Sequence, residues 1–214
     1  MKTGVQVFET CGREWFPALA GMTEKATSGV LTKIPRIICS VIRSMEKTVL
    51  IPRYEIQSKV KDLARQISSD YAGKEPIMIG ILNGVVFFFA ELVMSLSIPS
   101  KIDFIRASSY GSSKASSGMI KLVKDVEIPV KGQDLIVVED IVDTGLTLNS
   151  LVKNLKNRDP ASVKICALID KTERREQEVA IDYCGFKIQG GFLVGYGLDY
   201  AEQYRYLPDI CVLE

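Results

Sequence analysis

From about residue 52 onward, the chain alternates between apolar residues at helical spacing and short, continuous apolar runs. The helical spacing is clear at Ile56, Val60, Leu63 and Ile67, which would share one face of an amphipathic helix. The continuous runs are typical of strands buried on both faces. The expected helices are 56–72, 85–96 and 148–155, and the expected strands are 77–82, 102–109, 120–128, 135–138, 163–169 and 192–196. Strands that alternate with helices predict an α/β fold with a mainly parallel sheet.

Residues 77–96, "IMIGILNGVVFFFAELVMSL", are long and apolar enough to suggest a membrane span as an alternative. Asn83 and Gly84 interrupt this segment, and Glu91 would be costly in lipid. Pro76 and Pro99 also bracket it. We therefore expect a short buried strand, a sharp turn and a buried helix.

Residues 1–44 differ from the rest because polar and apolar residues mix there without a sustained period. They contain no contiguous apolar region followed by a small-residue cleavage site, so a signal peptide is not indicated. We expect residues 1–44 to be an N-terminal extension, disordered or read from an upstream start codon, and residues 45–214 to form the functional domain. An extra helix or strand that packs on the domain remains the alternative.

The overall charge is balanced, with 27 Lys and Arg against 26 Asp and Glu and a net charge of +1. This balance argues against a general nucleic-acid or membrane-surface binder. The five cysteines form no CxxC pair and indicate reduced thiols in a cytoplasmic protein. The chain has no histidine, which excludes Ser-His-Asp and Cys-His catalysis and HExxH metal sites. Acid–base chemistry must then use Asp, Glu, Lys or Tyr, and a metal would be a hard cation on oxygen ligands.

The segment "LIVVEDIVDTGLTLNSLV" carries the strongest chemical signal. An apolar strand runs into Glu139 and Asp140, Asp143 follows, and a turn of small and hydroxyl residues opens a helix. Three nearby carboxylates repel one another, so a positive group is expected among them. The turn directs backbone N–H groups and threonine hydroxyls to a helix N-terminus, which suits a phosphate. Together these features suggest a phosphorylated substrate with bound magnesium.

Other polar residues also follow predicted strands. Because open parallel sheets bind ligands at the carboxyl ends of their strands, Asn83-Gly84, Asp170-Lys171 and 195–199 should lie near the three carboxylates. Residues 110–118, "YGSSKASSG", are small and polar and predict a mobile loop or lid. No Walker or GxGxxG phosphate motif is present in the sequence.

The segment "VVEDIVDTGLTL" resembles the phosphoribosyl-pyrophosphate (PRPP) signature of the type I phosphoribosyltransferases. "GILNGVVFFFAEL", "DFIRASSYGSS", "ALIDKTERR" and "FLVGYGLDYAEQYRYLPDICVL" extend the resemblance to the hypoxanthine phosphoribosyltransferases of that family, over about residues 46–214. The resemblance implies a mainly parallel sheet flanked by helices, a small hood and a lid loop. It also implies Mg²⁺-dependent transfer of the 5-phosphoribosyl group from PRPP to hypoxanthine, and to guanine. The products would be IMP or GMP and pyrophosphate, made for purine salvage by a cytoplasmic homodimer or homotetramer.

The resemblance also implies roles for individual residues. Asp143 would be the general base or acid at purine N7, and Glu139 and Asp140 would address the ribose hydroxyls directly or through Mg²⁺. The 5′-phosphate would lie against the backbone N–H groups and hydroxyls of Thr144, Gly145, Leu146, Thr147 and Leu148. Lys171 would donate to the 6-oxo group and Phe192 would stack on the base. The remaining implied contacts are Leu193 and Asp199 for the purine edge, Asp199 for a second Mg²⁺, Leu82, Asn83, Gly84 and Arg205 for pyrophosphate, and Ser109 and Tyr110 for the lid.

Each position has a plainer alternative. The carboxylates could form a solvated rim, Lys171 could be a surface charge, Phe192 could belong to the core, and Arg205 could only pair with Glu202. A regulator that kept the fold but binds nucleic acid is a second functional hypothesis, against which the neutral charge argues. Among enzymes, guanine or xanthine specificity stays open because one lysine can serve every 6-oxopurine.

Overall fold

In the computed structural model, which describes residues 46–108 and 121–214, six strands form the central sheet in the order β4-β3-β2-β5-β6-β7. The strands β3, β2, β5, β6 and β7 run parallel, and β4 returns antiparallel to β3. Their bounds are β2 Ile77–Ile81, β3 Lys101–Ser108, β4 Lys121–Lys124, β5 Asp134–Val142, β6 Ser162–Lys171 and β7 Tyr183–Ile188. The prediction of an α/β fold with a mainly parallel sheet is confirmed.

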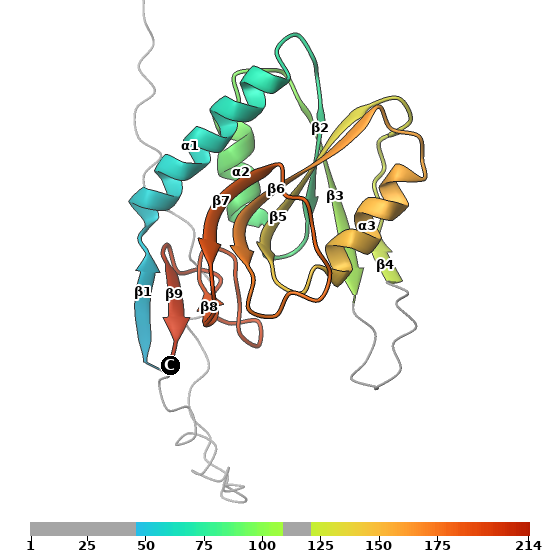
Figure 1. The fold of residues 1–214 in the computed structure, drawn as a ribbon. Helices are drawn as coiled ribbons and strands as arrows, with labels where there is room; N and C mark the ends of the chain where they lie inside the picture. The colour runs from blue at the N-terminus through green and yellow to red at the C-terminus, as the bar shows by residue number, and fades with distance from the viewer. Residues whose placement is uncertain (1–45, 109–120) are drawn as a thin grey trace, which may run out of the picture. The chain divides into compact units, whose positions relative to one another are not determined.

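Helices cover both faces of this sheet because successive strand residues point to opposite sides. Met78, Ile136 and Val138 pack with α1 (Arg53–Asp70) and α2 (Val86–Ser95) in one core cluster. The neighbouring residues Ile77, Ile79 and Val137 pack with α3 (Leu146–Lys156) in a second cluster. Figure 1 shows α3 on the opposite side of the sheet from α1 and α2. The three helices expected from the apolar spacing are thus present, with ends shifted by a few residues.

A second, antiparallel sheet of order β1-β9-β8 forms the hood. It consists of β1 (Lys47–Ile51), β9 (Ile210–Leu213) and β8 (Phe192–Val194). The sequence analysis missed β1 and β9, and also β7 of the main sheet. It placed residues 192–196 in the main sheet, which is wrong. The hood strands are short, and β1 is exposed along all but its last residue, so their apolar pattern is weak. In Figure 1 the hood lies on the side toward which the parallel strands point.

Residues 77–96 form β2, a turn and α2, so the membrane-span alternative is wrong. Within the described residues, no helix is both long enough and apolar enough to cross a bilayer. Glu91 of α2 accepts hydrogen bonds from Arg53 Nη2 at 2.7 Å and Gln57 Nε2 at 3.2 Å, and the Tyr196 hydroxyl donates to its other oxygen. The charge that interrupts the apolar segment therefore links α1, α2 and the hood.

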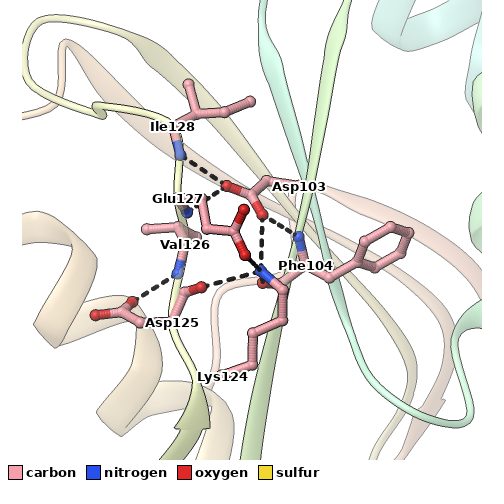
Figure 2. A network of polar contacts seen from close by, with 7 residues as sticks. All are labelled: Asp103, Phe104, Lys124, Asp125, Val126, Glu127 and Ile128. Atoms are coloured by element: carbon pink, nitrogen blue, oxygen red, sulfur yellow. Dashed lines mark hydrogen bonds and ion pairs between the residues drawn. The ribbon is translucent and has the colours of Figure 1, made fainter.

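The strand expected over residues 120–128 is shorter than predicted, because β4 ends at Lys124. A buried carboxylate replaces the ladder beyond that point, as Figure 2 shows. Asp103 Oδ2 accepts from the backbone N–H groups of Glu127 at 2.6 Å and Ile128 at 2.9 Å. Its Oδ1 accepts from Phe104 N at 2.7 Å and Lys124 Nζ at 3.2 Å. Burial alone would raise the pKa of Asp103, but these hydrogen bonds outweigh it and hold the pKa below its ordinary 3.8.

The predictions for residues 1–44, for the loop 110–118 and for Ser109 and Tyr110 lie outside the described residues. Among the described residues, Cys166, Cys184 and Cys211 are free cysteines.

Candidate active site

The turn after β5 has the geometry expected of an anion cradle. Gly145 caps α3 with φ +82°, a left-handed conformation that glycine adopts without strain. A Cβ at this position would also lie 2.3 Å from the Gln177 carbonyl oxygen, so only glycine fits. The first N–H groups of an α-helix have no acceptor within the helix, and Thr144 Oγ1 lies 3.4 Å from Leu146 N. Thr147 is exposed beside this helix end, and Leu148 is buried beneath it.

Glu139 and Asp140 lie within β5, which continues to Val142, rather than after it. Burial, together with the neighbouring Asp140 charge, raises the pKa of Glu139 well above its ordinary 4.5. Burial also raises the pKa of Asp140, although hydrogen bonds and the positive charge of Arg205 offset part of this effect. Burial is the largest cause of both shifts, so a cation bound beside the pair would favour the charged carboxylates.

Asp143 is held by its backbone and has a partly unpaired side chain. Arg175 Nε donates to the Asp143 carbonyl oxygen at 2.8 Å. The nearest cation to the carboxylate is Arg174, with Nη1 3.6 Å from Oδ2. Within the described residues, the buried Oδ1 accepts no hydrogen bond. A buried carboxylate oxygen without a donor is costly in a folded protein, so this oxygen is a candidate for contact with a substrate.

Lys171 ends β6 and is only 7% exposed, so it is not one of the surface charges that the alternative reading assumed. Its Nζ lies 3.7 Å from Glu173 Oε2. An ammonium that is largely buried at the carboxyl end of a central strand is available to a carbonyl group on a ligand. The structure is therefore consistent with the hydrogen-bond donor that the resemblance implies at this position.

Phe192 begins β8 and is 48% exposed, so it does not belong to the core. The Tyr200 ring meets it edge to face, with centroids 5.2 Å apart and an interplanar angle of 89°. This leaves an exposed aromatic surface beside buried Leu193. Exposed aromatic faces of this kind are suited to stacking on a planar heterocycle.

The turn that follows β8 touches the loop that follows β2. A Cβ on Gly197, whose φ is +101°, would lie 1.9 Å from the Gly84 carbonyl oxygen. Gly84 in turn approaches the Asp140 carboxylate, because a Cβ there would lie 1.7 Å from Oδ2. Neighbouring Asn83 is exposed, and its peptide bond with Leu82 is cis. The hood and the main sheet thus meet beside the paired carboxylates.

Arg205 connects several groups at this junction. It donates to the Gly197 carbonyl oxygen at 2.8 Å, and its Nη2 lies 2.8 Å from Asp199 Oδ1 and 3.1 Å from Glu202 Oε2. The pairing with Glu202 is thus real but is one contact among three. Asp199 Oδ2 also accepts from Glu202 N at 2.9 Å.

Two hollows meet at Asp143. The first lies over the helix N-terminus and is lined by Glu139, Ile141, Val142, Asp143, Thr144, Gly145, Thr147 and Leu148. The second lies between the main sheet and the hood and is lined by Asp140, Ile141, Asp143, Lys171, Arg174, Phe192, Leu193, Leu198 and Asp199. Asp143 and Ile141 are the residues that line both. An anion cradle therefore adjoins a pocket with an aromatic face and a buried ammonium.

Comparison with known proteins agrees with this geometry. The model of the phosphoribosyl transferase domain matches residues 53–201. The chain belongs to the phosphoribosyltransferase family. The hypoxanthine-guanine phosphoribosyltransferase of Bacillus subtilis (strain 168) is 45% identical over 78% of this phosphoribosyltransferase and 92% of the relative. The hypoxanthine-guanine phosphoribosyltransferase of Streptococcus pneumoniae (strain R6) is 48% identical over 78% of this chain and 93% of the relative. A crystal structure of a hypoxanthine-guanine phosphoribosyltransferase from Bacillus anthracis has a TM-score of 0.74 at 43% identity, covering 78% and 98% of the two chains.

The sequence analysis missed several residues around the site of this phosphoribosyltransferase. Arg174 lines the second hollow, and Arg175 is largely buried against the ends of β5 and β6. Tyr196 connects the hood turn to Glu91, and burial together with that hydrogen bond raises its pKa. The pair of arginines after Lys171 was the available signal, but charged residues in a loop are usually solvated.

The predicted metal residues of this phosphoribosyltransferase form no ready-made cage. Residues 46–108 and 121–214 contain no group of three or more His, Cys, Asp or Glu side chains arranged to hold a metal ion. Mg²⁺ commonly binds through one or two carboxylates together with substrate phosphates and water. The adjacent carboxylates of Glu139 and Asp140 in β5 are hard oxygen donors and fit that mode of binding.

Proposed function

We propose that this phosphoribosyltransferase transfers the 5-phosphoribosyl group from PRPP to hypoxanthine and guanine, giving IMP or GMP and pyrophosphate for purine salvage. The observation that carries the proposal is the position of Asp143, which lines both the anion cradle and the base pocket. A ribose that places its 5′-phosphate in the first hollow would direct its anomeric carbon toward the second. The names of the relatives support this choice of substrates.

On the PRPP side, the backbone N–H groups at the start of α3 would bind the 5′-phosphate with the hydroxyls of Thr144 and Thr147. Glu139 and Asp140 would bind the ribose hydroxyls, and their negative charge would stabilise the electron-poor ribose as pyrophosphate leaves. Asp199 would provide a further carboxylate for metal binding. When bound, Mg²⁺ supplies positive charge that neutralises the pyrophosphate.

On the base side, Lys171 would donate to the 6-oxo group and Phe192 would stack on the purine ring. Main-chain groups of Leu193 and Asp199 would contact the opposite edge of the base. The bond from the anomeric carbon to the pyrophosphate oxygen breaks as the bond to the purine nitrogen forms. Asp143 would exchange the N7 proton during this step.

The pyrophosphate would leave past the junction of the two sheets. The backbone of Asn83 and Gly84 lies beside Asp140 there, and the charge of Arg205 is near enough to offset part of the rise in the pKa of Asp140. Arg205 would exchange its contacts with Asp199 and Glu202 for contacts with the phosphate oxygens, because phosphate is a strong bidentate acceptor for a guanidinium.

The decisive experiment measures pyrophosphate release from PRPP and Mg²⁺ with hypoxanthine, guanine, xanthine and adenine in turn. We expect release with hypoxanthine and guanine and little with adenine; the xanthine reaction defines the tolerance at position 2. A protein that releases pyrophosphate with none of the 6-oxopurines does not have the proposed function. Size-exclusion chromatography of the same preparation tests the accompanying proposal of a homodimer or homotetramer.

The free thiols and the neutral charge also support a cytoplasmic enzyme that binds neither membranes nor nucleic acid. We further propose that residues 1–44 lie outside the catalytic domain. The first hood strand begins at Lys47, close to the proposed boundary at residue 45.

A further inference from the structure

The guanidinium group of Arg175 lies across the carboxyl ends of two neighbouring strands. On the β5 side, Nε donates to the carbonyl oxygen of Asp143 at 2.8 Å and Nη2 donates to that of Val142 at 3.0 Å. On the β6 side, Nη2 donates to the Lys171 carbonyl oxygen at 3.2 Å and pairs with the Asp170 carboxylate. One side chain thus contacts the backbone of both Asp143 and Lys171.

The position of Arg175 explains why a guanidinium is needed. The β5–β6 ladder ends at the pair Val142 and Asp170, and the contacts of Arg175 begin there. A guanidinium carries five N–H donors in a rigid plane and can therefore bridge acceptors on two strands, whereas a lysine ammonium is a compact point charge. The side chains of Arg175 and Asp170 are only 9% and 15% exposed, so water provides little substitute for these bonds.

The neighbouring phosphate turn is held separately. The backbone N–H groups of Glu176 and Gln177 donate to the Thr144 carbonyl oxygen at 2.9 Å and 3.0 Å. Asn149 Nδ2 also donates to the Glu178 carbonyl oxygen at 3.0 Å. None of these contacts uses the Arg175 side chain. The effects of Arg175 on the base pocket can therefore be separated from effects on the phosphate cradle.

We infer that Arg175 is a positioning residue for the base pocket, which fixes the spacing between the Asp143 carboxylate and the Lys171 ammonium. This inference rests on the proposed function, in which these two groups contact N7 and the 6-oxo group of one purine ring. A purine is rigid, so both contacts form together only when the two strand ends keep a set separation. An error of about 1 Å in such a spacing can cost about 100-fold in rate.

The test compares Arg175→Lys with the parent enzyme and with Arg158→Lys as a matched control. Arg158 also donates to a carboxylate, Asp125, at 2.7 Å, but it lies beyond the opposite end of α3 from the site. For each protein, kcat and KM are measured for PRPP and for hypoxanthine, together with the preference for hypoxanthine over adenine and the melting temperature.

For Arg175→Lys we expect kcat with hypoxanthine to fall at least about tenfold. The preference for hypoxanthine over adenine should also decrease about tenfold. The KM for PRPP should stay within about threefold of the parent, because the phosphate turn has its own backbone contacts. The Arg158→Lys control should match the parent in kcat and base preference. A purely stabilising role would lower the melting temperature and leave the base preference unchanged.

Arg175→Lys with parental kcat and base preference would overturn the inference while leaving the proposed function intact. A parent enzyme without activity on 6-oxopurines would overturn both. If Arg175→Lys fails to fold, the double variant Arg175→Met/Asp170→Asn removes both buried charges together, which is often tolerated. The same kinetic changes are expected of it, and unchanged base preference would again overturn the inference.

Discussion

Replacing Asp143 with asparagine should slow catalysis strongly while the fold and the PRPP site remain. The contacts from Arg175 are to backbone carbonyl groups, so a change of side chain does not remove them. Asparagine has nearly the shape of aspartate but cannot exchange a proton with N7. A positioned acid–base group contributes about 100- to 10,000-fold in rate. At about 1.36 kcal/mol per factor of ten, this raises the barrier by about 2.7–5.4 kcal/mol.

The same substitution should not destabilise the protein. Asp143 Oδ1 is buried and accepts no hydrogen bond within the described residues. The Arg174 side chain, 3.6 Å from Oδ2, is 66% exposed, and such screened pairs contribute little. Removing the charge also removes its desolvation cost. The free energy of unfolding should therefore remain within about 1 kcal/mol of the parent value or rise above it.

The assay measures kcat and KM for PRPP, with Mg²⁺ and hypoxanthine saturating, and unfolding in urea. Thr147→Ala is the contrasting variant, because it removes a phosphate contact and should mainly raise the KM for PRPP. The reasoning is refuted if Asp143→Asn keeps kcat within about threefold of the parent, far below the range for a proton-transfer group. Asp143 would then act through its charge on the ribose cation.

Three further predictions follow from the buried charges and the domain boundary. Asp103→Asn should lower the free energy of unfolding by about 2–4 kcal/mol at pH 7 in urea titrations, because an NH2 group replaces one carboxylate oxygen and the two donors to that oxygen lose their acceptor. The partly exposed control Asp62→Asn should change it by less than about 1 kcal/mol. Since the pKa of Asp103 is lower in the folded state than its ordinary 3.8, its contribution is present above about pH 4 and is lost as the pH falls through the folded-state pKa; a parent and variant with equal loss of stability in acid would contradict this. In pyrophosphate release, we expect the parent to prefer hypoxanthine over adenine by about 10,000-fold, and Lys171→Met should reduce this preference by at least about 100-fold. If the parent turned over adenine and hypoxanthine at comparable rates, Lys171 would not have this role. Deleting residues 1–44 should leave a folded, active enzyme, and precipitation or loss of pyrophosphate release by the truncated protein would show that the segment belongs to the fold.

The elements with a sustained apolar period could be predicted from sequence. The face formed by Ile56, Val60 and Leu63 is buried in α1 as expected, and all five residues of β2 are buried. The hood could not be predicted in the same way. Its strands have three to five residues and pair residues from the two ends of the domain, and such pairing depends on tertiary contacts rather than on local pattern.

The candidate site shows the same division. The turn from Asp143 to Thr147 could be recognised because its residues are adjacent in the chain and each has a local reason to be there. The partners of Glu91 could not, because Arg53 and Tyr196 are far from it in sequence. Arg175 was also missed, because the local sequence around an arginine in a solvated loop looks the same as that around an arginine buried against strand ends. The three-dimensional partners decide the role of such residues.

The strand order of the hood has a consequence for synthesis on the ribosome. The middle strand of this sheet, β9, comes after β8 in the sequence, and it pairs with β1 on one side and β8 on the other. A nascent chain can complete the parallel sheet and the turn at Asp143 before β9 has emerged. Without β9, the chain cannot complete the hood sheet, whose strand β8 presents Phe192 to the base pocket. An unfinished or C-terminally truncated chain would therefore expose two unpaired strand edges, which are recognised by chaperones and promote aggregation. Completion of the base pocket therefore waits for β9.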